Sequence, residues 1–135
     1  TAPRSDMAEP GAGFYPQQGQ IDAYGNGGFR FAGMSHRGSL LCLPTGMQAW
    51  PVDAVGQLTL DSLQPVLDVA EQLDVLLIGL GADIVGLDPA IRAALKARGV
   101  IVEAIATGGA VRTYNVLLAE DRAVGAALIA VENAR

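Results

Sequence analysis

The strongest constraint in this sequence is a short, uninterrupted apolar run, Val75 to Ile78, which ends at Gly79. Its length, its β-branched residues and its glycine boundary are typical of a strand that is buried on both faces. Asp88 followed by Pro89 predicts a helix start, because aspartate caps free backbone N–H groups and proline suits the first helical position. The two signals together predict a buried strand followed by a helix.

A second strand is predicted directly after this helix. Gly99 is a typical helix stop, and the apolar residues from Val100 to Ile105 indicate another strand. A strand, a helix and a strand at this spacing form a right-handed βαβ unit, in which the two strands are parallel. The predicted fold class is therefore α/β.

The N-terminal third has the pattern of antiparallel β structure. Residues 21–24 and 29–32 form a predicted hairpin through an Asn-Gly turn, with the two phenylalanines of the second strand toward the core and Arg30 toward water. A second turn, predicted at residues 35–38, leads to a buried strand at residues 39–43. We therefore expect an antiparallel β portion before the βαβ unit.

The remaining elements and the domain limits are predicted from the same signals. We predict a strand or loop at 45–57, a helix at 62–72 capped by Thr59 or Asp61, a last helix that begins at Thr107, and an interior strand at 123–131. Residues 1–19, which contain prolines, glycines and paired glutamines, are predicted to be a disordered tail. Residues 20–135 are then expected to form a single domain.

Composition narrows the classes of function. The net charge of −5 argues against nucleic-acid binding, which needs clustered Lys and Arg. There is no base between Arg37 and Arg92, and this stretch contains Asp53, Asp61, Asp68, Glu71, Asp74, Asp83 and Asp88. Such a stretch is usually a solvated face and less often a docking surface for a basic partner. The tip around residues 24–29 is a second candidate interface.

The chain is not expected to span a membrane. No apolar run approaches the roughly 20 residues that a spanning helix needs, so we expect a soluble, cytoplasmic protein. The single cysteine, Cys42, excludes an internal disulfide and leaves no set of thiols for a structural zinc site. Eight of the nine basic residues are arginine, which suggests a bacterial source with a GC-rich genome.

The geometry of the βαβ unit predicts one candidate site. Open α/β sheets bind ligands at the carboxyl edge of their parallel strands, where free N–H groups and an arginine suit a carboxylate or phosphate. The expected ligand-binding cleft contains Gly79, Leu80, Gly81, Thr107, Gly108, Gly109, Arg112 and Asn115. A purely structural role is the more common alternative, in which Thr107 caps its helix, Arg112 pairs with an acid and the glycines turn the backbone.

The glycine pair does not match a dinucleotide-binding loop. The third glycine of that fingerprint would stand at Ile84, and the predicted helix begins only near Asp88. We predict no cofactor and no metal site. We also predict no catalytic group, because His36 lies in a predicted turn without a Ser or Cys partner and Cys42 has the surroundings of a buried hydrophobe.

Several motifs in a fixed order resemble a known family. They are Gly28-Phe29, Trp50, Leu77-Ile78-Gly79-Leu80-Gly81, Thr107-Gly108-Gly109-Ala110 and the helix from Arg112-Thr113-Tyr114-Asn115 to Glu120. This pattern is similar to the Mth-type domain-of-unknown-function family, which includes the mitochondrial complex I assembly factor 3 and uncharacterised bacterial and archaeal proteins. The resemblance spans residues 20–131 and implies a compact three-layer α/β domain with a mixed central sheet and no established catalytic activity.

The sequence departs from this family at three places. Leu80 stands where the family often has Thr, and Val111 stands where it often has Cys, so a hydroxyl and a thiol are missing. Asp121 stands where the family commonly has Gly, a change that we expect to alter only a turn.

The residues and the resemblance support two hypotheses about function. The first is a non-enzymatic interaction protein that resembles the complex I assembly factor and whose partner is another protein. The alternative is a small-anion-binding domain or weak enzyme at the carboxyl edge.

Overall fold

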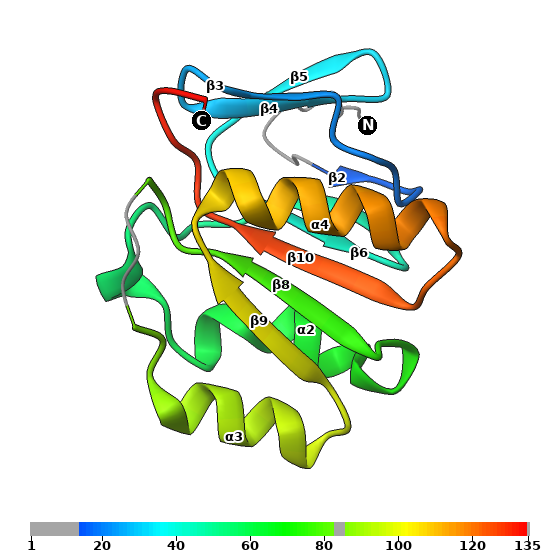
Figure 1. Cartoon of the computed structure of the whole chain (residues 1–135), viewed down its shortest axis with the longest axis vertical. Coiled ribbons are helices and arrows are strands. Elements are labelled where there is room, and N and C mark those ends of the chain that lie inside the picture. The colour runs from blue at the N-terminus through cyan, green and yellow to red at the C-terminus, as the bar shows by residue number, and fades with distance from the viewer. Residues whose placement is uncertain (1–13, 83–85, 135) are drawn as a thin grey trace, which may run out of the picture.

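The computed structural model describes residues 14–82 and 86–134, which fold around two sheets (Figure 1). The six-stranded sheet has the order β2-β7-β6-β10-β8-β9, with bounds Phe14–Tyr15, Gly46–Ala49, Leu40–Leu43, Val124–Leu128, Val75–Gly79 and Ile101–Ile105. The three-stranded sheet consists of β3 (Ala23–Gly25), β4 (Gly28–Phe31) and β5 (Met34–Arg37). The helices are α2 (Gln64–Asp68), α3 (Pro89–Ala97) and α4 (Thr107–Ala119), with 3-10 turns η2 (Val55–Gln57), η3 (Asp61–Leu63) and η4 (Ala70–Gln72).

The predicted βαβ unit is confirmed. Strands β8 and β9 are parallel, and Val75 is paired with Ile101. The Asp88 side chain accepts a hydrogen bond of 2.9 Å from the backbone N–H of Ala90 and so caps α3. Gly99 follows the helix with a φ of +84°, a conformation that glycine adopts without strain.

The mixed character of the large sheet depends on β10, the last strand. It lies between β6, with which it is antiparallel, and β8, with which it is parallel. All five of its residues are buried, as predicted for a strand in the sheet interior. The antiparallel N-terminal strands and the parallel βαβ unit are therefore joined by a strand from the end of the chain.

The sheet has a separate hydrophobic core on each face, which gives a three-layer domain. Leu76 and Ile78 of β8 pack with α2 and α3, whereas Leu77 of the same strand packs with α4 and the three-stranded sheet. Figure 1 shows α4 and the three-stranded sheet on one side of the large sheet and α2 and α3 on the other. The alternation of side chains along a strand produces this division.

The second hairpin turn differs from the prediction. Residues 35–38 were predicted as a turn, but Met34–Arg37 is a strand. The chain turns instead at Ala32 and Gly33, which have φ values of +52° and +75°. Sequence reasoning missed this turn because alanine rarely adopts a positive φ.

The predicted N-terminal tail also differs in part from the structure. Residues 1–13 of the predicted tail lie outside the described residues, but Phe14–Tyr15 forms β2 and pairs with β7. The Tyr15 ring lies edge-on to Phe31, with 5.9 Å between the ring centres. Residues 45–57, for which the sequence predicts a strand or a loop, contain the strand β7, Gly46–Ala49.

The predicted helix at 62–72 is broken into η3, α2 and η4. The N-cap residue of η3 is Leu60, which makes no side-chain cap, so neither Thr59 nor Asp61 is the N-cap; the hydroxyl oxygen of Thr59 still accepts a hydrogen bond from the backbone N–H of Ser62 at 3.1 Å. Pro65 lies in the first turn of α2, where its missing N–H costs little. The β-branched residues Val66 and Val69 lower the helix propensity of the rest of this segment.

The open edge of β9 is partly covered by a side chain. Among the described residues β9 pairs only with β8, so it stands at the end of the sheet order. Nη1 of Arg92, on α3, donates a hydrogen bond of 2.6 Å to the carbonyl oxygen of Val102. An occupied carbonyl makes an edge strand a poorer template for another strand.

We expect Gly79→Ala to lower the free energy of unfolding by about 1–3 kcal/mol, the usual cost of overpacking. A Cβ at this position would lie 2.9 Å from both Cα and Oγ1 of Thr107, and the Cα atom belongs to the backbone of α4. Urea unfolding followed by circular dichroism measures the change. Gly56→Ala is the matched control, because its Cβ would meet open space; equal stability of the two variants would contradict the close approach of α4 to β8.

Candidate functional site

The carboxyl ends of β8 and β9 meet at one edge, as the sequence predicts. Leu80, which follows β8, donates its backbone N–H to the carbonyl oxygen of Ile105 at 2.8 Å. Thr107, which begins α4 after β9, donates its backbone N–H to the carbonyl oxygen of Gly81 at 2.9 Å. The turn after β8 and the start of α4 are therefore directly bonded.

The hydroxyl of Thr107 does not cap its helix. The N-cap residue of α4 is Ala106, which makes no side-chain cap. The Thr107 hydroxyl instead donates to the carbonyl oxygen of Ile129 at 2.6 Å and accepts from the backbone N–H of Gly81 at 3.0 Å. Because Thr107 is fully buried, this hydroxyl satisfies two backbone groups that water cannot reach. The predicted capping role is wrong, and the observed role joins the ends of β8 and β10 to α4.

Four of the eight predicted site residues line one small pocket. Gly81, Gly108, Gly109 and Arg112 surround a volume of about 150 Å³, together with Tyr24, Ala82, Ala106, Val131 and Asn133. Nη1 of Arg112 lies 3.4 Å from the Tyr24 hydroxyl and donates to it. The pocket therefore combines the start of a helix with a guanidinium, which are two features that suit an anion.

The other predicted site residues lie beside or beneath this pocket. Leu80 lines a neighbouring hollow of about 440 Å³, which shares Gly81 with the small pocket. Gly79 and Thr107 are buried and line neither of them. Gly79 lacks a side chain where Thr107 of α4 packs against it. The helix α3 begins only at Pro89, so the loop after β8 does not have the form of a dinucleotide-binding loop. Ile84 lies outside the described residues.

Asn115 holds the N-terminal segment and does not line the pocket. Its side-chain oxygen accepts from the backbone N–H of Ile21 at 2.8 Å, and its side-chain nitrogen donates to the carbonyl oxygen of Ile21 at 2.8 Å. The Asn115 amide therefore satisfies both backbone groups of Ile21, as a neighbouring strand would. Its inclusion in the ligand cleft is not supported by this arrangement.

The thiol and the phenol in the core are held in their neutral forms. Burial raises the pKa of Cys42 far above its usual range, and burial also raises the pKa of Tyr114, with the neighbouring Cys42 as a second cause. The Tyr114 hydroxyl donates to the carbonyl oxygen of Gly19 at 2.7 Å. A thiol without thiolate character is a poor nucleophile, so the prediction of Cys42 as a buried hydrophobe is confirmed.

His36 lies on a strand and not in the predicted turn. It belongs to β5, and its Nε2 lies 3.0 Å from the carbonyl oxygen of Ser39. This contact holds the ring beside the chain that leads into β6. Among the described residues, no group of three or more His, Cys, Asp or Glu side chains is arranged to hold a metal ion.

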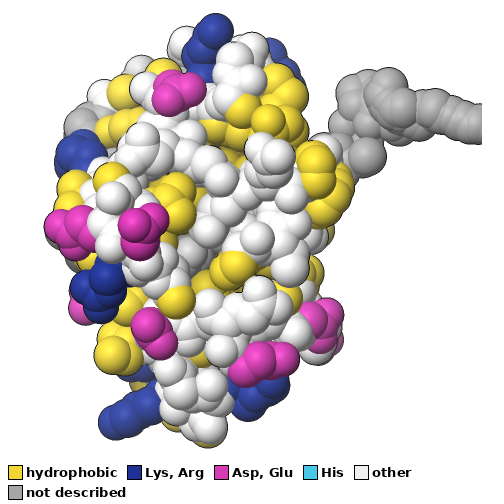
Figure 2. Space-filling model, turned by 90° about the vertical axis from the view of Figure 1, so that its right-hand side faces the viewer, with side chains coloured by type: hydrophobic (Ala, Val, Ile, Leu, Met, Phe, Trp, Pro, Cys, Tyr) yellow, Lys and Arg dark blue, Asp and Glu magenta, His cyan; other side chains and the backbone are white. Residues whose placement is uncertain are grey.

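The acidic stretch is a solvated surface. Its described members are all exposed, namely Asp53, Asp61, Asp68, Glu71, Asp74 and Asp88, and Asp83 lies outside the described residues. A carboxylate oxygen of Glu71 lies 4.0 Å from the Arg98 guanidinium. Figure 2 shows one face of the molecule, on which acidic and basic side chains lie mainly toward the border and are not separated by sign.

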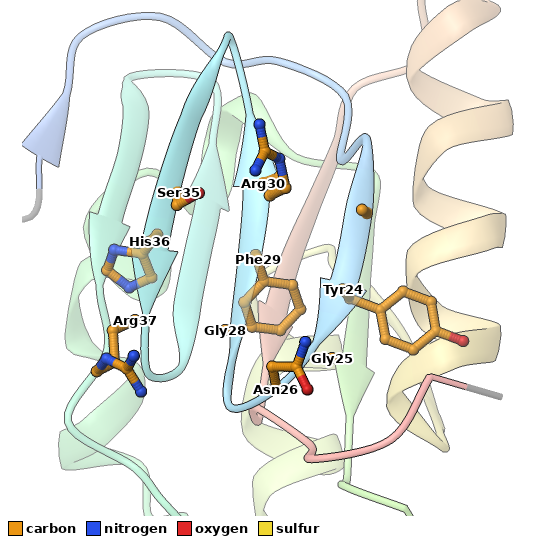
Figure 3. Close-up of a pocket in the computed structure, with 10 residues that line it drawn as sticks. Tyr24, Gly25, Asn26, Gly28, Phe29, Arg30, Ser35, His36 and Arg37 are labelled. Carbon is orange, nitrogen blue, oxygen red and sulfur yellow. The ribbon is translucent and has the colours of Figure 1, made fainter.

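Residues of the tip at 24–29, a candidate interface from the sequence, line part of a hollow on the three-stranded sheet, but the sequence did not indicate the hollow itself. It has a volume of about 460 Å³ and is lined by β3, β4 and β5, with Arg30 and Arg37 among its residues (Figure 3). The strict alternation of Phe29, Arg30 and Phe31 indicated the outward direction of Arg30. The second arginine was missed because its strand was predicted as a turn.

Comparison with known proteins decides the family. A family model described as a protein of unknown function (DUF498/DUF598) matches residues 21–129. The chain belongs to this family. Within the described residues of this DUF498/DUF598 domain, no helix is long and apolar enough to cross a membrane.

Relatives of this DUF498/DUF598 domain include uncharacterised proteins and assembly factors. An uncharacterized protein of Rhodobacter capsulatus is 43% identical over 127 residues, which are 93% of this chain and 94% of that protein. The mouse NADH dehydrogenase [ubiquinone] 1 alpha subcomplex assembly factor 3 is 31% identical over 115 residues. That alignment covers 85% of this chain but only 62% of the mouse protein.

Solved structures have the same fold as this DUF498/DUF598 domain. The crystal structure of a Bartonella henselae protein, described as an outer membrane protein, has a TM-score of 0.84 and 47% identity over 87% of this chain and 99% of that chain. The solution structure of a Bordetella pertussis Mth938-like domain has a TM-score of 0.75 and 27% identity over 99% of this chain and 95% of that chain. The predicted resemblance to the Mth-type family is therefore confirmed.

We expect Thr107→Val to lower the free energy of unfolding of the DUF498/DUF598 domain by about 1–3 kcal/mol, because it leaves the buried carbonyl of Ile129 without a donor. Thr107→Ser retains the hydroxyl and should lose clearly less. Chemical denaturation measures both values. If Thr107→Val kept the wild-type stability and Thr107→Ser lost it, the methyl group and not the hydroxyl would be the important part of Thr107.

Proposed function

We propose that this protein is a non-enzymatic protein-binding factor that assists the assembly of a membrane respiratory enzyme. The observation that supports this role is the relationship to assembly factor 3, which extends over 85% of this chain. The family match at residues 21–129 includes the three-stranded sheet, α4 and every strand of the large sheet except β2, so the proposal concerns the whole domain and not a single motif.

The hydrogen bonds at the carboxyl edge favour a binding role over a catalytic one. The Thr107 hydroxyl and the Asn115 amide, which are polar side chains of the predicted cleft, both bond to backbone groups of this chain. Tyr114 and Cys42 are neutral and buried in the core. These polar groups stabilise the fold, so we assign the function to the surfaces that the fold presents.

Deletion of the gene, in a bacterium that carries it and a complex I, is expected to reduce the amount of fully assembled complex I in membranes. An assembly factor acts on the yield of the complex, so subassemblies should accumulate. Blue native electrophoresis with an in-gel NADH oxidation assay measures both. Wild-type protein supplied from a plasmid should restore the complex.

An affinity-tagged copy provides a second measurement of the same proposal. Subunits or subassemblies of the respiratory enzyme should co-purify with it in amounts well above those from an untagged strain. Normal levels of complex I in the deletion strain, together with no enriched partner, would refute the proposal.

A small-anion site is the second candidate function, and the pocket of about 150 Å³ favours it. Gly108 and Gly109 lie in the first turn of α4, where backbone N–H groups have no carbonyl partner within the helix. Arg112 stands at the same pocket and donates to Tyr24. A bound phosphate or carboxylate would compete with the tyrosine hydroxyl for the guanidinium.

We expect, from this second candidate, that one member of a panel of phosphates and carboxylates raises the melting temperature by several degrees. Ligand at a hundredfold excess over its Kd adds ~2.7 kcal/mol to the stability of the folded state. Arg112→Ala should abolish this shift at little change in fold, and Arg122→Ala, on an exposed residue after α4, should retain it. A flat response of the wild-type protein to the whole panel would end this second proposal.

A further inference from the structure

The outer face of the three-stranded sheet carries two arginines and otherwise small side chains. Phe29 and Phe31 point inward and are only 2% and 4% exposed, whereas Arg30 between them is exposed. Since side chains alternate along a strand, the residues paired with Arg30 share its outward direction. Across the sheet these partners are Ala23 on β3 and Ser35 on β5.

The next outward row contains the second arginine. Arg37 on β5 is paired with Gly28 on β4, which is paired with Gly25 on β3. Two of these three positions have no side chain. The two arginines therefore stand over a hollow of about 460 Å³ whose other outward residues are small (Figure 3).

This hollow is basic although the chain as a whole has a net charge of −5. No Asp or Glu lines it. Within the described residues, neither the Arg30 nor the Arg37 guanidinium takes part in an ion pair or a side-chain hydrogen bond. The Glu132 carboxylate lies at one margin, on the side of Arg37: a Cβ on Gly27 would lie 3.1 Å from Oε2 of Glu132 and 4.0 Å from Nη1 of Arg37. Two guanidiniums with unused donors favour a ligand that has at least two anionic groups.

The spacing of the arginines indicates the shape of that ligand. Two residues along a strand span about 6.8 Å and neighbouring strands lie about 4.8 Å apart, so the two arginine backbones are about 8 Å apart. In an extended chain, side chains at positions i and i+2 point the same way and are about 6.8 Å apart. Long arginine side chains can adjust for the small difference.

We propose that this face binds an extended acidic segment of a partner protein, in which two carboxylates stand two residues apart. The proposal deepens the protein-binding function and rests on it for the nature of the partner. A second copy of this chain does not supply such a segment, because none of its 14 acidic residues stands two positions from another. The charge complementarity also makes the interaction weaker at high salt.

The test is an NMR titration of the ¹⁵N-labelled full chain with a synthetic peptide in which glutamate alternates with serine. Amide signals of Ala23, Gly25, Gly28 and Ser35 should shift, and the Kd should weaken at least tenfold in the double variant Arg30→Ala and Arg37→Ala. The matched control is the double variant Lys96→Ala and Arg122→Ala, which removes the same charge from other exposed positions. It should bind within twofold of the wild type.

Two further ligands test whether the spacing of the carboxylates matters and whether any carboxylate is sufficient. A peptide of the same composition with its glutamates in adjacent positions should bind less tightly, because one carboxylate of each pair points away from the sheet. Acetate at the same carboxylate concentration should cause no comparable shifts. Equal weakening in both double variants, or none in either, would overturn the proposal, and so would an effect of the arginine substitutions on self-association in sedimentation.

Failure of this inference is distinguishable from failure of the proposed function. If a respiratory-enzyme partner co-purifies equally with the wild type and with the arginine double variant, the protein-binding role stands and this face is not the site. If the peptide binds as expected but no partner co-purifies with the wild type, the face is an acidic-segment site and the assembly role fails.

Discussion

The buried hydroxyl of Thr107 is the interaction on which the carboxyl edge of this domain depends. It bonds to the chain after β8 and to the chain after β10, and it stands at the first residue of α4. Gly79 has no side chain at the place where Thr107 approaches most closely. The Thr107 hydroxyl and the absence of a side chain at Gly79 therefore set the position of α4 on the sheet. The position of α4 in turn sets the surface that Tyr24 and the three-stranded sheet contact.

The central part of the fold could be predicted because its signals are local. Asp88, Pro89 and Gly99 mark the ends of α3 by rules that need no tertiary contact, and all are confirmed. The turn at Ala32 could not be predicted, since a positive φ at alanine is imposed by the pairing of β4 with β5. β2 was missed for a related reason: two residues form a strand only because β7 offers an edge to them.

The meeting of the two strand ends could be predicted, but the roles of the residues there could not. Topology alone brings the ends of β8 and β9 together, so Gly81, Gly108, Gly109 and Arg112 do meet at one pocket. The hydrogen bonds of Thr107 and Asn115 depend on Ile129 and Ile21, which are distant in the sequence. Partners at such separations leave no periodic pattern, and this is why a ligand role and a structural role could not be separated beforehand.

The hydrogen bond between Arg92 and Val102 affects which other chains can pair with the edge of the large sheet. In the proposed assembly role, the protein would meet incompletely folded chains, whose unpaired strands can extend an open sheet by main-chain hydrogen bonds that do not depend on sequence. Because the Val102 carbonyl oxygen already accepts a hydrogen bond from the Arg92 guanidinium, β9 is a poorer partner for the addition of an unrelated strand. Any recognition of a partner would then depend on side chains on the faces of the molecule, which can distinguish one sequence from another.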